Sequence, residues 1–355
     1  MLAGKGGSLA AAGASLLAWY DREQRDLPWR RTTEPYAVWL SEVMLQQTQV
    51  DTVAPRFDSF LERFPDPAAL AAASEQQVVA AWSGLGYYRR ARQLHAAAQR
   101  VVEAGRLPRT AQEWQRLPGI GEYTAAAIAS ISGGEVIAVL DGNVERVVSR
   151  LLASACEPKK AAVRRRLRAA AEQLLDRDRP GDTNQALMEL GALVCRPREP
   201  ACERCPLRAS CSAAASGDPG RFPPARRRPA TIRVVRQLFV VHRAGCTLLF
   251  RRSPTASTLP GFWELPWLDG AVRETLDRDL ETKYGGRWLV IAGETRLRHA
   301  ITNRRFVIGV HGGDWRSPAV EQQAAGWYSA EEIATLPTSS LVAKALAASA
   351  DGKRR

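Results

Sequence analysis

The chain has 355 residues, which is enough for two domains that each have a core. Apolar residues make up 45% and charged residues 25%, as in ordinary globular proteins, and no apolar run reaches the roughly 18 residues of a membrane-spanning helix. A net charge of +13 favours a polyanionic partner, of which nucleic acid is the commonest. Charge alone does not establish that partner, because arginine-rich compositions also arise without one.

The first predicted helix begins near Ser8 and carries Leu16 and Tyr20 on one apolar face. It continues without a break into the charged residues 21–25, which favours an amphipathic helix over a secretory signal peptide. Four of the six cysteines lie close together at metal-ligand spacing, which is typical of a reducing compartment. We therefore expect a cytoplasmic protein.

The composition changes once along the chain. Residues 8–213 are rich in Ala, Leu, Arg and Gln with Pro or Gly between segments, which predicts helices. A stretch rich in Gly, Pro and Arg follows, and beyond it come short β-rich runs at 237–242, 247–250 and 306–310, with a predicted helix over 271–282. The sequence thus predicts an all-α domain over residues 1–215, a linker over 216–232 and an α+β domain over 233–350.

The strongest chemical motif is Cys195-x6-Cys202-x2-Cys205-x5-Cys211. Four thiolates this close can hold one metal centre, and the compact, asymmetric loop favours a [4Fe–4S] cluster. A structural zinc ion, the alternative, is more usually held by two Cys-x2-Cys knuckles that lie far apart. We expect Cys156 and Cys246, outside the motif, to be small buried apolar residues.

A second motif is Leu117-Pro118-Gly119-Ile120-Gly121, followed by a predicted helix over 122–132. Gly119 and Gly121 permit a tight turn that leaves amide groups pointing outward at a helix N-terminus, where they can bind a phosphate. Further along, Asp141 lies between an apolar run and a predicted helix over 144–152. It is expected to cap that helix, and an ionised carboxylate there can also stabilise a positive charge.

Glu42 lies in an apolar helical run, residues 38–50, beside Trp39 and Met44. Burial among such neighbours would raise the pKa of the carboxyl group, so that it could stay protonated and act as a general acid. An acid of this kind can protonate a leaving group as its bond breaks. An isolated glutamate on a helix is more often solvated, so the neighbouring sequence decides between the two interpretations.

The run Trp39–Val50 resembles the MutY family of adenine DNA glycosylases, as do Leu27-Pro28-Trp29-Arg30 and Gly84-Leu85-Gly86-Tyr87-Tyr88. The cysteine spacing and the glycine turn resemble the cluster loop and the helix–hairpin–helix of the wider endonuclease III superfamily. The resemblance extends from about Leu16 to Cys211 and, more loosely, over the rest of the chain. It implies a monomeric base-excision repair enzyme acting on double-stranded DNA that contains A:8-oxoguanine or A:G mispairs.

The resemblance also implies roles for individual residues. Glu42 is the general acid, Asp141 stabilises the oxocarbenium-like sugar, Asn143 orients the acid groups and Tyr123 lies near the sugar. The remaining DNA-contacting and base-contacting residues that it implies are Arg25, Trp29, Arg30, Gln47, Tyr87, Leu117, Gly119, Gly121 and Glu189. The cluster ligands are Cys195, Cys202, Cys205 and Cys211.

Two departures from related patterns bear on activity. Relatives that also cleave the strand carry a nucleophilic lysine where this chain has Tyr123, so no Schiff base is expected here. The C-terminal part resembles the Nudix-like domain that reads 8-oxoguanine, but its helix lacks the adjacent glutamates that bind magnesium in Nudix hydrolases. Its recognition loop has Thr302 and Asn303 where the family usually has Ser and His.

Two other functions stay open at this point. The first is a pyrimidine-specific glycosylase with lyase activity, against which Tyr123 and Glu42 argue. The second is a non-catalytic DNA-binding protein that uses the cluster and the hairpin alone, against which the presence of Glu42 and Asp141 argues. An assay on a mismatched duplex distinguishes all three.

Overall fold

The computed structural model describes residues 8–352 except 157–159, 225–229, 254, 257, 271–272, 292, 294, 302 and 317–324. The chain forms two compact units: residues up to 74 together with 89–227, and residues 75–88 together with those from 228 onward. No helix among the described residues is long and apolar enough to span a membrane.

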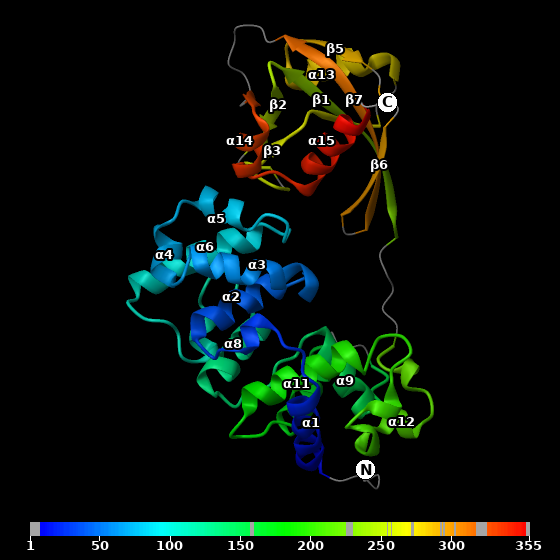
Figure 1. Ribbon diagram of the computed structural model, residues 1–355. Helices are drawn as coiled ribbons and strands as arrows, with labels where there is room; N and C mark the ends of the chain where they lie inside the picture. The colour runs from blue at the N-terminus through cyan, green and yellow to red at the C-terminus, as the bar shows by residue number, and fades with distance from the viewer. Residues whose placement is uncertain are drawn as a thin grey trace. The chain divides into compact units, whose positions relative to one another are not determined.

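The described part of the first unit is built from helices and short 3-10 turns, without a strand (Figure 1). This confirms the predicted all-α domain. Its helices are α1 (Leu9–Glu23), α2 (Pro35–Leu45), α3 (Val50–Arg63), α4 (Pro67–Ala72), α6 (Arg89–Glu103), α7 (Ala111–Trp114), α8 (Glu122–Gly133), α9 (Gly142–Leu151), α10 (Ala161–Glu172), α11 (Pro180–Leu193) and α12 (Ser212–Ala215). Its 3-10 turns are η1 (Pro28–Arg30), η2 (Cys202–Arg204), η3 (Arg208–Ser210) and η4 (Pro219–Arg221).

One core of this unit lies among α1, α8, α9 and α11. Leu16 of α1, Val148 of α9 and Leu187 of α11 are fully buried in it. Cys195, Cys205 and Cys211 are partly buried against the same cluster. The cysteine loop is therefore packed on the helix that begins at Asp141.

The helix predicted over residues 38–50 ends earlier than expected, at Leu45, and α3 begins at Val50. The reason lies in another helix. The buried Arg90 of α6 donates to the carbonyl oxygens of Val43 and Met44 at 2.8 and 2.7 Å. These two carbonyl oxygens at the end of α2 therefore have donors without a continuation of the helix. Gln47 then takes the left-handed conformation, at φ 58°.

The second unit contains a mixed sheet with helices on both faces, which confirms the predicted α+β class. The strands are β1 (Ile232–Arg243), β2 (Cys246–Arg251), β3 (Trp263–Glu264), β4 (Trp267–Asp269), β5 (Arg287–Ile291), β6 (Arg296–Ile301), β7 (Arg304–Arg316) and β8 (Ala325–Tyr328). The helices are α5 (Glu75–Ala81), α13 (Leu276–Tyr284), α14 (Ala330–Thr335) and α15 (Ser340–Gly352), and a 3-10 turn, η5, covers Arg273–Thr275.

Side chains that alternate between the two faces of β1 pack against two different helix layers. Phe239 and Val241 pack with Leu276 and Leu280 of α13. Their neighbours in the strand, Leu238 and Val240, pack instead with the cluster that includes Leu341 and Val342 of α15. The helix predicted over 271–282 is present as α13, which begins at Leu276 after η5.

Candidate active site

Glu42 is buried in α2, with 6% of its surface exposed, as its apolar neighbours predicted. Its Oε2 accepts a hydrogen bond of 2.8 Å from the Tyr123 hydroxyl of α8. Burial raises the pKa of the Glu42 carboxyl group to about 7, and the Asp141 carboxylate adds to the rise while the Tyr123 hydrogen bond and the Arg30 charge oppose it. This carboxyl group can therefore give up or keep a proton near neutral pH.

The Tyr123 hydroxyl lies close enough to both carboxyl groups to respond to them. Burial raises its pKa well above the ordinary value, and the charges of Glu42 and Asp141 raise it further. The hydroxyl also contacts Met188 Sδ at 3.2 Å. Tyr123 therefore stays protonated and donates, which makes it a holder of the Glu42 carboxylate rather than a nucleophile.

Asp141 is the N-cap of α9, as predicted. Its Oδ1 accepts from the backbone N–H groups of Asn143 and Val144 at 3.0 and 2.7 Å, and its Oδ2 accepts from Asn143 Nδ2 at 3.0 Å. Burial raises the pKa of the carboxyl group, and these three donors oppose the rise. The cap thus fixes the carboxylate in one orientation while the helix N-terminus favours its negative charge.

Asn143 is itself held by α11. A Cβ at Gly191 would lie 2.6 Å from Asn143 Cβ, so only glycine permits this approach of the two helices. Asn143 Oδ1 accepts from Arg146, whose guanidinium also donates to the carbonyl oxygens of Cys195 and Gly191 at 2.8 Å each. The Asp141 side chain is therefore connected through Asn143 and Arg146 to the first cysteine of the loop.

Three charged residues expected in the base pocket contact one another. Glu189 of α11, 1% exposed, accepts from the guanidinium groups of Arg25 and Arg30 at 2.7 to 2.9 Å. Although burial acts to raise it, these hydrogen bonds lower the pKa of Glu189 to about 2. Trp29 is buried and packs edge-to-face on Phe57. Arg30, a member of this ion cluster, lies near enough to Glu42 for its positive charge to lower the pKa of the Glu42 carboxyl group.

The glycine turn joins α7 to α8. Gly119 has φ +78°, and a Cβ there would lie 2.8 Å from Gln93 Cβ, so a side chain is excluded on both counts. The carbonyl oxygen of Leu117 accepts from Ile120, and Gly121 is the N-cap of α8 with open space around it. This is the geometry expected of a hairpin that offers backbone N–H groups to a phosphate.

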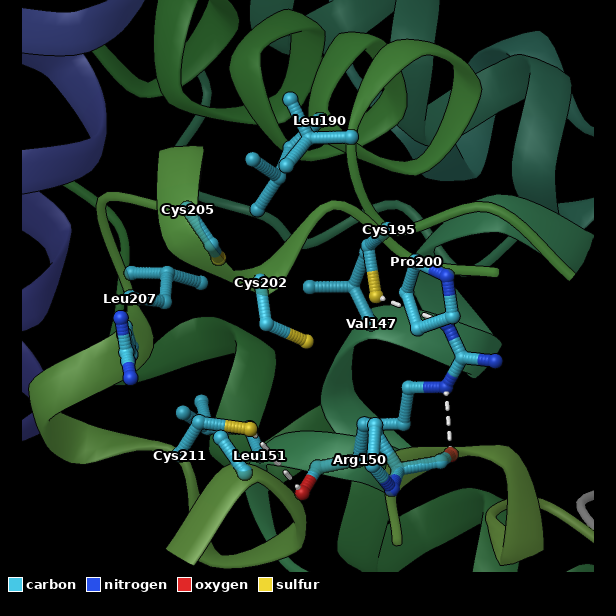
Figure 2. A pocket seen from close by; sticks show the side chains of 14 residues that line it. Val147, Arg150, Leu151, Leu190, Cys195, Pro200, Cys202, Cys205, Leu207 and Cys211 are labelled. Carbon is cyan, nitrogen blue, oxygen red and sulfur yellow. Dashed lines mark hydrogen bonds between the residues drawn. The ribbon is translucent and has the colours of Figure 1, made fainter. Parts of the chain in front are cut away.

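The four cysteines of the loop line one pocket, together with apolar side chains such as Leu190 and Leu207 (Figure 2). Among the described residues, no three or more His, Cys, Asp or Glu side chains converge tightly enough to hold a single metal ion. Burial raises the pKa of the Cys205 thiol to about 12. Such a thiol ionises only when a positive centre lies beside it.

Arg150 of α9 joins the two ends of the cysteine loop. The side chain, 3% exposed, donates to Cys195 Sγ at 3.3 Å (Figure 2). It also donates to the carbonyl oxygen of Arg196 at 2.7 Å. Its Nε donates to the carbonyl oxygens of Pro219 and Phe222, beyond the last cysteine. Hydrogen bonds between protein groups thus hold the two ends of the loop together.

Known proteins resemble the chain over both its sequence and its fold. Residues 40–173 match the HhH-GPD superfamily base excision DNA repair protein family. Adenine DNA glycosylase of Mycolicibacterium smegmatis is 43% identical over 205 residues, which cover 56% of this chain and 68% of that protein. This chain belongs to the adenine DNA glycosylase family. The superfamily match, over residues 40–173, covers Glu42, Tyr123 and Asp141.

This member of the adenine DNA glycosylase family is also similar to a human protein and to a solved structure. The human adenine DNA glycosylase is 39% identical over 346 residues, covering 82% of this chain. The chain spans less than two thirds of that relative, 63% of its length. The structure of a thermostable thymine-DNA glycosylase covers 59% of this chain and 97% of its own, with a TM-score of 0.54 and 28% identity.

Four further residues implied by the family resemblance are Gln47, Tyr87, Thr302 and Asn303. Gln47 is exposed between α2 and α3, and Tyr87 is 50% exposed with φ 48° in the turn before α6. Thr302 lies outside the described residues. Asn303 Nδ2 donates to the carbonyl oxygen of Ala230 at 2.9 Å, so the chain's own backbone engages this amide.

Sequence reasoning missed residues that support the site. Arg146 and Arg150 follow Asn143 at helical spacing on α9, and that periodicity could have identified them. No local signal could have identified Met188, which reaches the Tyr123 hydroxyl from another helix. The prediction that Cys156 and Cys246 are buried was wrong, since Cys156 is exposed and Cys246 only partly buried.

Proposed function

We propose that this protein hydrolyses the N-glycosidic bond of adenine mispaired with 8-oxoguanine or guanine in duplex DNA. The observation that carries the proposal is the buried Glu42, whose pKa is raised to about 7 and whose Oε2 is held by the Tyr123 hydroxyl. A carboxyl group with such a pKa is an efficient proton donor near neutral pH. Membership of the adenine DNA glycosylase family supports adenine as the base.

In the proposed reaction the adenine nucleotide is flipped out of the duplex to reach the buried carboxyl groups. Glu42 donates its proton to N7, and the electron pair of the C1′–N9 bond leaves with the adenine. The Asp141 carboxylate stabilises the positive charge that develops on the sugar. Water adds at C1′ and gives its proton to a carboxylate. Tyr123 and Asn143 hold the two carboxyl groups in place throughout.

The proposed enzyme releases the base without cutting the strand. A glycosylase that also cleaves DNA needs an amine that forms a Schiff base with the sugar. At that position the chain has Tyr123, whose hydroxyl is committed to Glu42. A pyrimidine-specific glycosylase with lyase activity is therefore not favoured.

A single-turnover assay tests the proposal on duplexes with A:8-oxoguanine, A:G or A:C pairs. The wild-type protein should release adenine from the first two. Glu42→Gln should release none above background yet bind the duplex within a few-fold of wild type, because phosphate contacts are untouched. Glu62→Gln, which alters an exposed glutamate of α3, is the matched control and should remain active. Adenine release by Glu42→Gln would refute the role of that residue.

The proposal includes a [4Fe–4S] cluster bound by Cys195, Cys202, Cys205 and Cys211. Its support is the chemistry of four thiols around one pocket and their distribution. The compact, asymmetric spacing of the four cysteines favours a cluster over zinc, which is more usually held by two Cys-x2-Cys knuckles far apart. When bound, the cluster cross-links the loop that Arg150 closes.

Metal analysis of anaerobically purified protein tests the cluster. About four iron atoms per chain and a broad absorption at roughly 400 nm are expected. Cys202→Ser should lose iron and melt at a lower temperature, whereas Cys246→Ser, outside the loop, should keep both. About one zinc and no iron would refute the assignment.

Recognition of 8-oxoguanine is proposed for the C-terminal domain, at Thr302 and Asn303, which follow β6 and precede β7 in the sequence. The bond from Asn303 Nδ2 to Ala230 weighs against that amide nitrogen as the reader of the base. The double variant Thr302→Ala/Asn303→Ala should lose roughly tenfold to a hundredfold on A:8-oxoguanine and less on A:G. Equal losses on both duplexes would show that these two residues do not read the lesion.

A further inference from the structure

The sheet of the C-terminal domain has one face that carries arginines from three adjacent strands. In Figure 1, β1, β6 and β7 extend beyond the rest of that domain. Residue pairing places Arg305 of β7 beside Arg233 of β1 and Ala300 of β6, and Val307 of β7 beside Val235 and Arg298. Because side chains alternate between the two faces of a sheet, these residues and Arg296 point to one side.

The other side of the same strands is covered. Phe306, Ile308 and Leu297 alternate with the residues above and pack with Leu341 and Val342 of α15. On the side that carries the arginines, α13 packs on Phe239 and Val241 of β1 and so covers that part of the sheet. The side chains of Gln237 and His311 then meet over Gly309, with a hydrogen bond of 2.9 Å.

Beyond that pair, the arginine side is open to solvent. Arg233, Arg296, Arg298 and Arg305 are all exposed, and Val235 between them is 48% exposed. We call the surface formed by these four arginines the arginine face.

Within the part of the chain that the structure describes, no acidic side chain neutralises the arginine face. The paired segments 232–238, 296–301 and 304–310 contain no Asp or Glu. Among the described residues, no carboxylate lies within ion-pair distance of the four guanidinium groups, although Arg236, on the covered side, pairs with Asp269. Arg233 and Arg305 occupy neighbouring strands about 4.8 Å apart, an arrangement of like charges that costs stability. A bound polyanion would remove that repulsion.

We infer that the arginine face binds the sugar–phosphate backbone of duplex DNA without regard to base sequence, at a place distinct from the glycine hairpin and the catalytic residues. This rests on the proposed function, which makes DNA the polyanion available. Guanidinium groups bind phosphate oxygens in a bidentate manner. Arg296 and Arg298, two residues apart on β6, lie about 6.8 Å from each other, so the four charges form a patch rather than a point.

A duplex suits this patch better than an acidic protein does. DNA carries one negative charge per roughly 1.7 Å of its axis, so several phosphates meet four exposed arginines in almost any placement. A protein partner would need carboxylates matched to the positions of these four arginines and an apolar centre larger than Val235 and Val307. The charge pattern therefore favours DNA.

The test measures binding of the full chain to an undamaged duplex of about 30 base pairs over a series of salt concentrations. The slope of log Kobs against log salt is about −0.9 per phosphate contact, so Arg233→Gln/Arg296→Gln/Arg298→Gln/Arg305→Gln should flatten it by about 1.8 to 3.6. The matched control removes the same charge elsewhere in the domain, as Arg251→Gln/Arg278→Gln/Arg287→Gln/Lys344→Gln, and should leave the slope near wild type.

An unchanged slope in the arginine-face variant, or equal flattening in the control, would overturn the inference. Arg296→Gln/Arg298→Gln alters one strand only and should give an intermediate slope, which keeps the test valid if the quadruple variant is poorly folded. Because the duplex is undamaged, the measurement does not depend on adenine excision. If the arginine-face variant keeps the wild-type slope while the wild-type protein excises adenine, only this inference is wrong. If the variant flattens the slope while the wild-type protein excises no adenine, only the proposed function is wrong.

Discussion

Replacing Tyr123 by phenylalanine should move the pH range in which the enzyme works. The hydroxyl donates to Glu42 Oε2 at 2.8 Å, and this bond lowers the pKa of the carboxyl group because it stabilises the charged form. Phenylalanine keeps the ring and its packing but removes the donor. The carboxylate form of Glu42 then becomes less stable, and the pKa rises further.

The size of the shift follows from the strength of the bond. A hydrogen bond to a charged group contributes about 1.5–3 kcal/mol, and one pKa unit corresponds to 1.36 kcal/mol, so the shift should be about 1–2 units. The pKa of Glu42, about 7 in the wild-type protein, should reach roughly 8–9. A general acid works while it is protonated, so the alkaline limb of the rate profile should move upward by the same amount.

The assay is single-turnover adenine release from an A:8-oxoguanine duplex with enzyme in excess, between about pH 5.5 and 9.5. The matched control is Tyr36→Phe, which removes another buried hydroxyl, bonded to the carbonyl oxygen of Phe64 at 2.9 Å and not to Glu42. Its alkaline limb should stay near pH 7. If the limb of Tyr123→Phe stays in place or moves downward, the hydroxyl does not hold the Glu42 carboxylate.

Three further predictions concern the same unit. Glu42→Gln should be more stable than wild type at pH 8 by up to about 3 kcal/mol and equal to it below pH 4.5, as thermal melts at both pH values can check. The pKa of the Glu42 carboxyl group rises from 4.5 to about 7 on folding, so the wild-type protein loses stability as the pH rises between those values. Asp141→Asn should keep its melting temperature within a few degrees, since asparagine also caps helices, while single-turnover excision falls at least a hundredfold. Gly119→Ala should weaken binding of A:8-oxoguanine and A:G duplexes equally, whereas Gly134→Ala, with the same backbone strain but open space, should bind normally; unequal losses would contradict a backbone-phosphate role.

Features that depend on neighbours in the chain could be predicted from the sequence. The cap at Asp141 needs only the three residues after it, and the turn at Gly119 needs a positive φ that glycine readily adopts. Periodicity was sufficient for the class of both domains, because the helical and strand repeats differ. The burial of Glu42 followed from the apolar residues around it on the same helix.

Only the tertiary structure decided which distant groups meet. Glu42 reaches Tyr123 across 81 positions and Glu189 reaches Arg25 across 164, and no sequence period links such pairs. Arg90 ends α2 from another helix, so the helix predicted to Val50 stops at Leu45. The arginine face exists because strand pairing sets Arg233 beside Arg305, although 71 residues separate them. Contacts of this kind depend on how the chain packs against itself, which local propensities do not encode.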